Sequence, residues 1–346
     1  MSNSRPTVKH PLSFCSPIGR NNMLDRDITW RSNKLSYKIS RRKALINSLK
    51  WGTGICLSIP IAILAVIIPD SLIKAFGRAL GIIAFHLLSR ERNRAIKNIT
   101  AAMPSLQRGS GWLHAGETPH GIAREVFANL GISCIELIKL YHGNGERIID
   151  SVAITGIENY QKAQSLGKGV ILISGHCGNW ELMGMAVCRQ LAKLSVVARK
   201  QPNSFFNGII EKLRNRYGSS VIYNRGAAKT IFLTLRKKEI VGIIIDQVVA
   251  PSEGEIVDFL DRPAWMTNAP PAIAEKTGSP IVPFFIHREN GGHRVTISEP
   301  VYPEQFSNAT EITQKLNAEI EEYIRNHPDE WLWMYNRWKG VHQHHI

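Results

Sequence analysis

The chain has 346 residues, of which 44% are hydrophobic and 21% are charged, and it carries a formal net charge of +15. This composition excludes a disordered chain, because there are enough apolar residues to bury a core in one large domain or two modest ones. The five cysteines are few, odd in number and without paired spacing, so no zinc site or disulfide framework is indicated and a reducing compartment is favoured.

The first fifty residues hold much of the positive charge, with eleven lysines and arginines against two aspartates. A basic tail of this kind is typical of binding either to nucleic acid or to an anionic membrane surface. Eighteen uncharged residues, Trp51–Ile68, follow it directly, and a basic segment that leads into such a stretch favours the membrane. We therefore predict a flexible tail over 1–50, a membrane partner and no nucleic-acid partner.

Two apolar segments follow the tail. Trp51–Ile68 is at the short end of a bilayer-spanning helix and contains Pro60, and it starts too late in the chain for a cleaved signal peptide. Leu72–Leu88 carries Lys74 and Arg78 on one helix face, as an amphipathic helix at a membrane interface would. Because basic residues flank both segments, a shallow insertion with both ends on the cytoplasmic side fits better than a crossing. The alternative is two buried core helices of a soluble protein.

From residue 150 onward the pattern becomes an alternation of short apolar strands and helices. After a loop over 104–120, helical spacing predicts one helix over 122–141. Strands are predicted over 169–175, 194–198, 220–222, 240–245, 281–286 and 294–298, and helices over 179–192, 205–217, 226–238, 268–277 and 309–326. This alternation predicts an α/β fold with a mixed, mostly parallel central sheet flanked by helices, and an N-terminal membrane-associating helical region. The predicted organisation is a tail over 1–50, anchoring helices over 51–100, the α/β domain over 101–340 and a second tail over 341–346.

The strand over 169–175 ends in a glycine and delivers His176, with Glu181 five residues later. Asn179 is a candidate cap for the next helix, which puts Glu181 in the first helical turn, within reach of the imidazole. A carboxylate on one ring nitrogen raises the basicity of the other, so His176 and Glu181 are the predicted catalytic pair, with His176 removing a proton from a hydroxyl. The alternative is a structural histidine beside a helix-start glutamate. We expect Cys177 to be structural, because neighbouring side chains on an extended chain point to opposite sides.

The segment around His176 resembles a motif of a known protein family. Gly175-His-Cys-Gly-Asn-Trp-Glu181 resembles the His-x4-acid motif of membrane acyltransferases, and most closely that of the bacterial late lipid A acyltransferases, the lauroyl and myristoyl transferases. The similarity continues in order through Arg90-x-Arg92…Asn98, Arg199-Lys-Gln-Pro-Asn203, Gly242-Ile-Ile-Ile-Asp-Gln247, Phe259-Leu-x-x-Pro-Ala-x-x-Thr267, Thr277-Gly-x-Pro-Ile-Val-Pro283 and Trp331-Leu-Trp333…Arg337-Trp-Lys339. It covers roughly residues 50–340.

The resemblance implies that a fatty acyl chain moves from acyl carrier protein to a hydroxyl of a lipid A precursor. It implies no metal and no bound cofactor, and it places the enzyme at the bacterial inner membrane with its active site on the cytoplasmic side. We also expect a hydrophobic channel beside the histidine to hold the acyl chain and set its length.

Five further residues are predicted to bind substrate or shape its site. Arg199 would lie near an oxyanion or the acceptor phosphate, or be a structural arginine at a strand end. Asn203 would shape the same loop, or be a plain turn residue. Asp246 and Gln247 end a strand, where open α/β sheets place their sites, and would position groups there, unless Asp246 caps a loop. Arg337 would contact acceptor phosphate or the acidic carrier.

Three departures from the family pattern bear on the acceptor. Cys177 replaces a phenylalanine, Val248 replaces an aspartate after Asp-Gln, and Tyr335-Asn336 replaces a His-Arg pair. We expect the tryptophans Trp331, Trp333 and Trp338 to be core or membrane-interface anchors. Two alternatives to lipid A acylation stay open. One is an acyltransferase acting on a glycerolipid, an aminoacyl lipid or another glycolipid, and the other is an inert membrane-binding relative.

Overall fold

The computed structural model describes residues 59–108, 117–224, 226–289 and 291–341. The tail predicted over 1–50, all but the first residue of the tail predicted over 341–346, and the first part of the apolar segment 51–68 lie outside these residues. The described residues from 62 onward form one compact unit, to which the following description applies. Residues 62–67 are helical, and a short 3-10 turn, Asp70–Leu72, leads into the first long helix.

A seven-stranded sheet forms the centre of the unit, in the order β1-β9-β8-β2-β5-β3-β4. All pairs in it are parallel except β8 with β9, which confirms the predicted mixed, mostly parallel sheet. Its strands are β1 (Val152–Thr155), β2 (Val170–Ser174), β3 (Leu194–Ala198), β4 (Ser220–Tyr223), β5 (Ile240–Ile244), β8 (Ile281–Glu289) and β9 (Gly292–Ile297). A separate antiparallel hairpin is made by β6 (Gly254–Asp258) and β7 (Pro263–Thr267).

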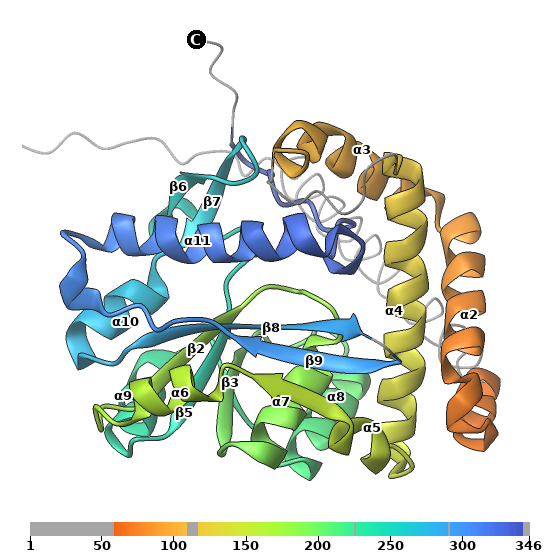
Figure 1. Cartoon of the computed structure of the whole chain (residues 1–346), viewed down its shortest axis with the longest axis horizontal. Coiled ribbons are helices and arrows are strands. Elements are labelled where there is room, and N and C mark those ends of the chain that lie inside the picture. Colours follow the sequence, from red (N-terminus) through yellow and green to blue (C-terminus); the bar gives the residue numbers. More distant parts are fainter. Residues whose placement is uncertain (1–58, 109–116, 225, 290, 342–346) are drawn as a thin grey trace, which may run out of the picture. The chain divides into compact units, whose positions relative to one another are not determined.

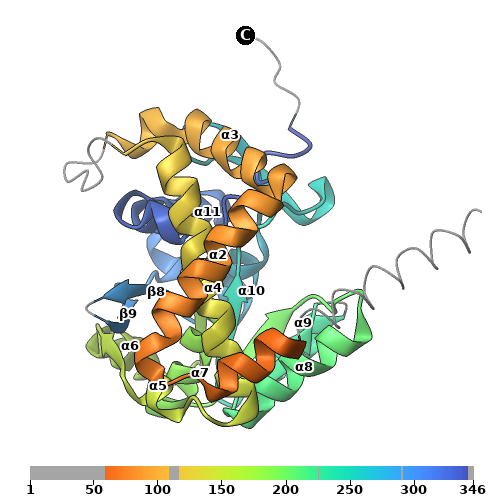
Figure 2. The same cartoon turned by 90° about the vertical axis from the view of Figure 1, so that its right-hand side faces the viewer.

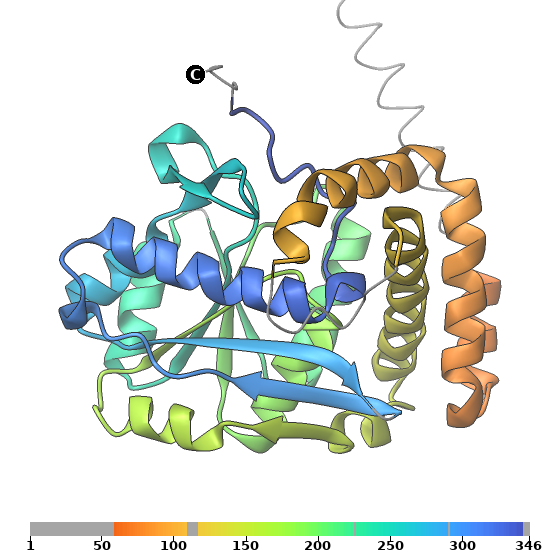
Figure 3. The same ribbon diagram turned by 45° about the horizontal axis from the view of Figure 1, so that its top comes forward.

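Helices cover both faces of the sheet (Figure 1). They are α2 (Ile73–Leu87), α3 (Ser89–Leu106), α4 (Pro119–His142), α5 (Glu146–Asp150), α6 (Ile157–Gln164), α7 (Trp180–Gln190), α8 (Ser204–Arg216), α9 (Ala227–Arg236), α10 (Ala269–Thr277) and α11 (Ala309–Asn326). In Figure 3, α11 runs across the strands on one side of the sheet, whereas α6 and α7 lie on the other side.

The fully buried strand β2 supplies side chains to both hydrophobic cores. Ile171 and Ile173 join one cluster, with residues of α9, α10 and α11, while Val170 and Leu172 join the other, with residues of α6, α7 and α8. Strand side chains alternate between faces, so a strand buried on both faces is a continuous apolar run. This explains why the Val-Ile-Leu-Ile run was a good strand predictor.

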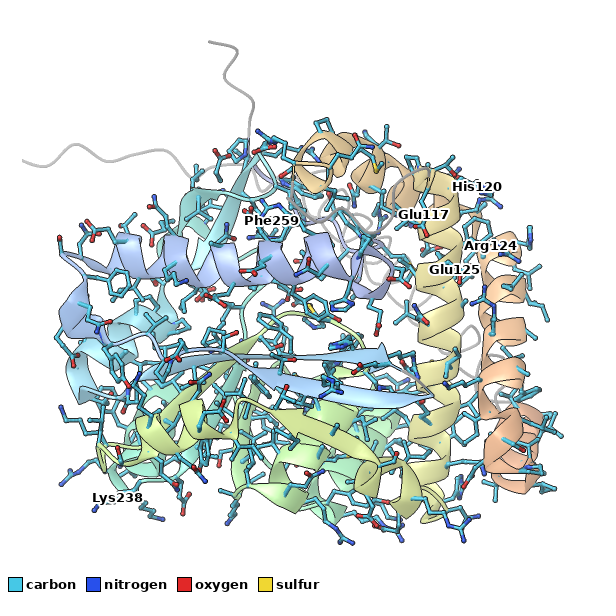
Figure 4. The ribbon with its side chains drawn as sticks, viewed as in Figure 1. Glu117, His120, Arg124, Glu125, Lys238 and Phe259 are labelled. Atoms are coloured by element: carbon cyan, nitrogen blue, oxygen red, sulfur yellow. The ribbon has the colours of Figure 1, made fainter. Side chains whose placement is uncertain are left out.

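Helices α2 and α4 pack with their backbones in close contact; they lie side by side in Figure 1, and in Figure 2 α2 crosses in front of α4. A Cβ atom added at Gly81 would lie 2.1 Å from the Phe127 carbonyl oxygen, and one at Gly131 would lie 2.2 Å from the Gly77 carbonyl oxygen. Only glycine fits at such distances, so a side chain at these positions would force the two helices apart. Arg78 also bonds Glu125, which Figure 4 labels on α4.

The predicted second apolar segment corresponds to α2, and it is apolar on two sides. One side, with Ile73, Gly77, Gly81 and Phe85, is buried. Large apolar residues are nevertheless exposed along the same region: Ile63, Leu64, Ile67, Leu72, Ile83, Leu87 and Leu88. Among the described residues, no single helix has the length and apolar character to cross a bilayer; α2 with its preceding turn and α3 would meet the criterion only as a pair bent by 93°.

Candidate active site

Two neighbouring parallel strands end at the site. The register pairs Ser174, the last residue of β2, with Ile244, the last residue of β5. His176 and Asp246 each lie two residues further along, so the sheet brings them to the same level. The Nδ1 atom of His176 lies 2.7 Å from Oδ1 of Asp246. The carboxyl edge of the sheet is where open α/β folds place their ligand sites, and here it assembles a histidine–carboxylate pair.

Asp246 is held from several sides and is almost fully buried. Its second oxygen, Oδ2, accepts hydrogen bonds from the backbone N–H of His176 at 2.8 Å and from the indole Nε1–H of Trp331 at 2.9 Å. Burial alone would raise the pKa of this carboxyl, but the charge and hydrogen bonds of His176 and the bond from Trp331 outweigh it, so the pKa of Asp246 is lowered. The carboxyl is therefore ionised at neutral pH.

His176 has the opposite shift. Burial would lower the pKa of the imidazole, but the charge of Asp246, its hydrogen bond and the more distant charge of Glu181 together raise it above the ordinary histidine value. With Nδ1 facing Asp246, the Nε2 atom faces the other way and lies 3.2 Å from the side-chain nitrogen of Gln247. The ring thus has one nitrogen fixed by a carboxylate and one directed toward a polar neighbour.

The predicted pairing of His176 with Glu181 is wrong. Glu181 is in the first turn of α7, as predicted, but its carboxylate forms a bidentate pair with Arg214 of α8, with N–O distances of 2.8 and 2.6 Å. Nδ1 of His176 is already bound by Asp246, and a guanidinium fork matches a carboxylate better than an imidazole does. Glu181 acts on His176 only through its charge.

His176 opens onto a cleft of about 360 Å³. Of the predicted site residues, His176, Glu181, Arg199 and Gln247 line this cleft. Further polar side chains of the lining come from α8 and the adjoining loop and strand: Gln201, Asn207, Glu211, Arg214 and Tyr223. The Trp180 ring meets the imidazole edge to face, with ring centroids 5.1 Å apart. The cleft therefore combines a basic imidazole with a polar wall and one aromatic side.

A narrower apolar cavity of about 50 Å³ shares part of its lining with this cleft. It lies between α7 and strands β3 and β5, with Met183, Gly184, Leu194, Gly242 and Phe284 among its lining residues. Trp180, Glu181, Val197, Arg214 and Ile244 line both spaces. The combination of a polar cleft and an adjoining apolar slot suits a substrate with a polar reacting end and a hydrocarbon end.

Two other predicted substrate-binding residues have structural contacts instead. Asn203 is the N-cap of α8, where its side-chain oxygen accepts hydrogen bonds from the backbone N–H groups of Phe205 and Phe206. Arg337 is fully buried, donates to the carbonyl of Trp265 and lies 4.6 Å from the ring centroid of Phe259, which Figure 4 labels beside the β6–β7 hairpin. Burial lowers the pKa of Arg337 to about 10. The prediction that Arg337 contacts a phosphate or a carrier protein is contradicted by this burial.

A buried ionic cluster supports the loop that carries His176. Asn179 caps α7, as predicted, by accepting a hydrogen bond from Leu182, and its amide donates to Glu136 of α4 at 2.8 Å. Glu136 also binds Arg288 and His293, and although burial opposes ionisation, these partners lower its pKa to about 2. The start of α7 is therefore fixed to α4 and to strands β8 and β9.

Cys177 is structural, as expected. The thiol is fully buried, and burial together with the charges of Asp246 and Glu330 raises its pKa well above the ordinary cysteine value. Such a thiol is a poor nucleophile. Trp331 was expected to be a core or membrane-interface residue; it is buried in the core, and its indole also donates a hydrogen bond to Asp246. The position of a Trp-x-Trp motif near the end of the chain gave no signal of this contact.

The sequence matches the family described as bacterial lipid A biosynthesis acyltransferase over residues 17–340. The chain belongs to this family. Members of the family transfer acyl groups.

Similar curated proteins include acyltransferases with different lipid acceptors. The phosphatidylinositol mannoside acyltransferase of Mycobacterium tuberculosis is 26% identical over 62% of this chain and 66% of its own length, just under two thirds. The lipid A biosynthesis palmitoleoyltransferase of Escherichia coli is 23% identical over 79% of this chain and 86% of its own length. Among solved structures, the 1-acyl-sn-glycerophosphate acyltransferase of Thermotoga maritima matches 69% of this chain and 99% of its own, with 16% identity and a TM-score of 0.36.

Proposed function

We propose that this member of the lipid A acyltransferase family is an O-acyltransferase that moves a fatty acyl chain from a thioester to a hydroxyl of a lipid A precursor. The observation that carries the proposal is the 2.7 Å contact between Nδ1 of His176 and Asp246, with Nε2 of His176 directed toward the cleft side of Gln247. An imidazole oriented in this way is suited to take a proton from an alcohol.

The proposed reaction balances with two substrates. Nε2 of His176 takes the proton of the acceptor hydroxyl while the hydroxyl oxygen attacks the thioester carbonyl carbon and forms a C–O bond. The resulting tetrahedral oxyanion collapses, the C–S bond breaks, and the imidazolium returns the proton to the leaving thiolate. Asp246 stays ionised throughout and stabilises the imidazolium, while Arg199 in the cleft wall carries a positive charge that suits an acceptor phosphate.

We expect the apolar slot beside α7 to receive the distal end of the acyl chain. A Cβ atom at Gly184, which lines the slot, would meet only ordinary contacts, 3.7 Å to Leu194 and 3.9 Å to Ser219, so a side chain can be added there without a clash at its first carbon. Gly184→Leu is expected to shift the preferred donor to a shorter acyl chain, because each methylene that no longer fits costs about 1–3 kcal/mol. Competition between acyl thioesters of different length, read by mass spectrometry, measures this shift.

The matched control for this variant is Gly208→Leu. Gly208 is also a helix glycine, but nothing lies within 4 Å of a Cβ atom placed there. Its chain-length preference should equal that of the wild type. If both variants keep the wild-type preference, or both change it equally, the slot does not hold the acyl chain.

The exposed apolar residues of 62–88 support a membrane-facing role for this side of the protein. Ile67 and Leu87 are 72% and 75% exposed, and five further large apolar residues of the same region are also exposed. A surface of this kind is unusual on a protein that meets only water. Together with the basic residues among the first fifty, it supports attachment to an anionic membrane. We propose that this membrane is the bacterial inner membrane and that the active site lies on its cytoplasmic side.

Acyl carrier protein is the proposed donor. Basic side chains of α8, such as Lys212 and Arg216, and the net charge of +15 would attract an acidic carrier to the protein. Coenzyme A thioesters are the alternative donor, and the rates of acyl transfer from the two donors can be compared in the same enzyme preparation.

A second acceptor class has specific support. The mycobacterial relative that acylates a mannoside lipid is 26% identical, slightly more than the Escherichia coli palmitoleoyltransferase at 23%, although over a shorter stretch. A glycolipid acceptor other than lipid A is therefore the second candidate. Both acceptors present an alcohol to the same imidazole.

The deciding experiment combines gene deletion with complementation. Total lipids of the deletion strain are compared by mass spectrometry with those of strains that carry wild-type protein, His176→Ala or the control His142→Ala. We expect the deletion to remove one acyl mass from lipid A, and His142→Ala but not His176→Ala to restore it. Loss of an acyl mass from another lipid class alone would favour the second acceptor, and full restoration by His176→Ala would refute the mechanism.

A further inference from the structure

A C-terminal segment, defined as residues 330–335, is bound to both loops of the candidate dyad. The carbonyl of Glu330 accepts from the N–H of Gly178 at 2.7 Å, and the N–H of Leu332 donates to the carbonyl of His176 at 3.2 Å. The hydroxyl of Tyr335 accepts from the N–H of Val248, two residues beyond Asp246. The segment therefore holds together the ends of two strands that are remote from it in the sequence.

Trp331, at the centre of this segment, is the one whose side chain reaches the dyad. It is 1% exposed, it forms a bridge with Cys177, and its Nε1–H lies 2.9 Å from Oδ2 of Asp246. We propose that Trp331 is a positioning residue of the acyl-transfer site, which acts on His176 through Asp246. This inference rests on the proposed function for its catalytic consequence, whereas its effect on His176 can be measured without any substrate.

The two oxygens of the Asp246 carboxylate have different hydrogen-bond partners. Oδ2 of Asp246 accepts from the Trp331 indole and from the His176 backbone, which leaves Oδ1 for Nδ1 of the imidazole. Two donors on Oδ2 fix the plane of the carboxylate and favour its ionised form in a buried position. The carboxylate in turn fixes the tautomer in which Nε2 is free to take a proton.

The same hydrogen bond tunes the basicity of the histidine. An indole N–H presents the positive end of its dipole to the Asp246 carboxylate, and this partial charge weakens the attraction between the carboxylate and the imidazolium. Other charges also face the pair: Glu181 with its partner Arg214 on the cleft side, Arg199 in the cleft wall, and the buried Arg337 behind Asp246. None of these changes when the indole N–H alone is removed.

Trp333 provides a matched comparison within the same motif. It is as deeply buried as Trp331, and its ring meets the Trp331 ring edge to face with centroids 4.7 Å apart. Its Nε1–H, however, donates to the carbonyl of Pro328, away from the dyad. Removing the N–H group from either residue costs one buried hydrogen bond, but only at Trp331 does that bond touch Asp246.

The experiment removes each N–H group in turn. Trp331→Phe and Trp333→Phe are prepared in the full-length protein, together with a variant that carries benzothienylalanine at position 331, which keeps the bicyclic ring but lacks the donor. The pKa of His176 is followed by NMR of protein labelled at its twelve histidines, and His176→Gln identifies the signal. Both variants at Trp331 should raise the pKa of His176 by about one unit, and Trp333→Phe should leave it unchanged.

Kinetics supply the second measurement. Both variants at Trp331 should lower kcat about tenfold with KM within about twofold, and should move the acid limb of the pH–rate profile upward by the same shift. Trp333→Phe loses its own buried hydrogen bond to Pro328 but should keep the wild-type profile. An unchanged His176 pKa in the folded benzothienylalanine variant, or an equal change in Trp333→Phe, overturns the inference. If the wild type lacks acyl transfer, the proposed function fails while the NMR comparison still decides the role of Trp331.

Discussion

Asp246→Asn is expected to lower kcat for acyl transfer by about 10²–10⁴-fold, the range associated with loss of an effective general base. An asparagine side chain keeps the shape but presents an amide. If its NH₂ group faces Nδ1 of His176, the imidazole carries its proton on Nε2, which is the atom that must take the proton of the acceptor. The amide also cannot stabilise the imidazolium that forms during the reaction.

Steady-state rates over a range of pH measure this effect. In the wild type, the raised pKa of His176 means that the neutral base forms at higher pH than in an ordinary histidine, so the rate should rise with pH through the pKa of His176. Without the carboxylate, the pKa of His176 should fall, and the acid limb should move to lower pH although the maximum rate is small.

Asp258→Asn is the matched control for Asp246→Asn. Asp258 ends β6 and is exposed, and it lines none of the cavities at the site. Its kcat should equal that of the wild type. A rate for Asp246→Asn within about threefold of the wild type would show that Asp246 does not orient the base, because a general base contributes about 10² or more.

Local sequence patterns predicted most of the sheet and its helices. The apolar runs of β2, β3 and β5 are short, continuous and bounded by polar turns, so each strand could be located from its own residues. Strand β1 and the β6–β7 hairpin, which are runs of only four or five residues, were not predicted. The helix over Pro119–His142 was predicted over 122–141, close to its observed bounds.

The partner of His176 could not be chosen from the sequence in the same way. Glu181 is five residues from the histidine, whereas Asp246 is seventy residues away, and only the pairing of β2 with β5 brings it near. Strand order is a property of the whole sheet and is absent from local periodicity. The sequence did place Asp246 at a strand end in the site, but proximity along the chain favoured the wrong carboxylate.

Two C-terminal residues show the same limit of local sequence patterns, since one was wrongly predicted to contact substrate and the other was not predicted to reach the site. Trp331 and Arg337 lie in one short motif, and charge alone made the arginine the better candidate for a substrate contact. In the fold, the arginine is buried beside Phe259 and the tryptophan contacts Asp246. Which side chain of a segment faces a site depends on tertiary packing, so a charged residue is not a sufficient indicator.

A large loss of stability is expected when the ion pair of Glu181 with Arg214 is broken, because their side chains are only 12% and 19% exposed. Removing one member of a buried pair leaves the other charge without its partner, so Glu181→Gln and Arg214→Gln should each lower the free energy of unfolding by about 3 kcal/mol. The double variant should lose much less than the sum. Denaturant unfolding of the four proteins measures this coupling. As a control, Glu299→Gln, which breaks the exposed pair of Glu299 with Lys162, should cost less than about 1 kcal/mol.

Measurements of activity distinguish two roles for Glu181: positioning Arg214, or acting directly on His176 as the sequence predicted. If Glu181 mainly positions Arg214 in the cleft wall, the fold loss of kcat in Glu181→Gln should be at least about ten times smaller than in Asp246→Asn. The reason is that Nδ1 of His176 keeps its partner Asp246. The loss of the Glu181 charge should also lower the pKa of His176, because that charge helps to raise it. The contrary result would be equal losses of kcat in Glu181→Gln and Asp246→Asn, together with additive stability changes for Glu181→Gln and Arg214→Gln. Glu181 would then be the carboxylate that acts on His176, and the pairing of His176 with Asp246 would have to change when substrate binds.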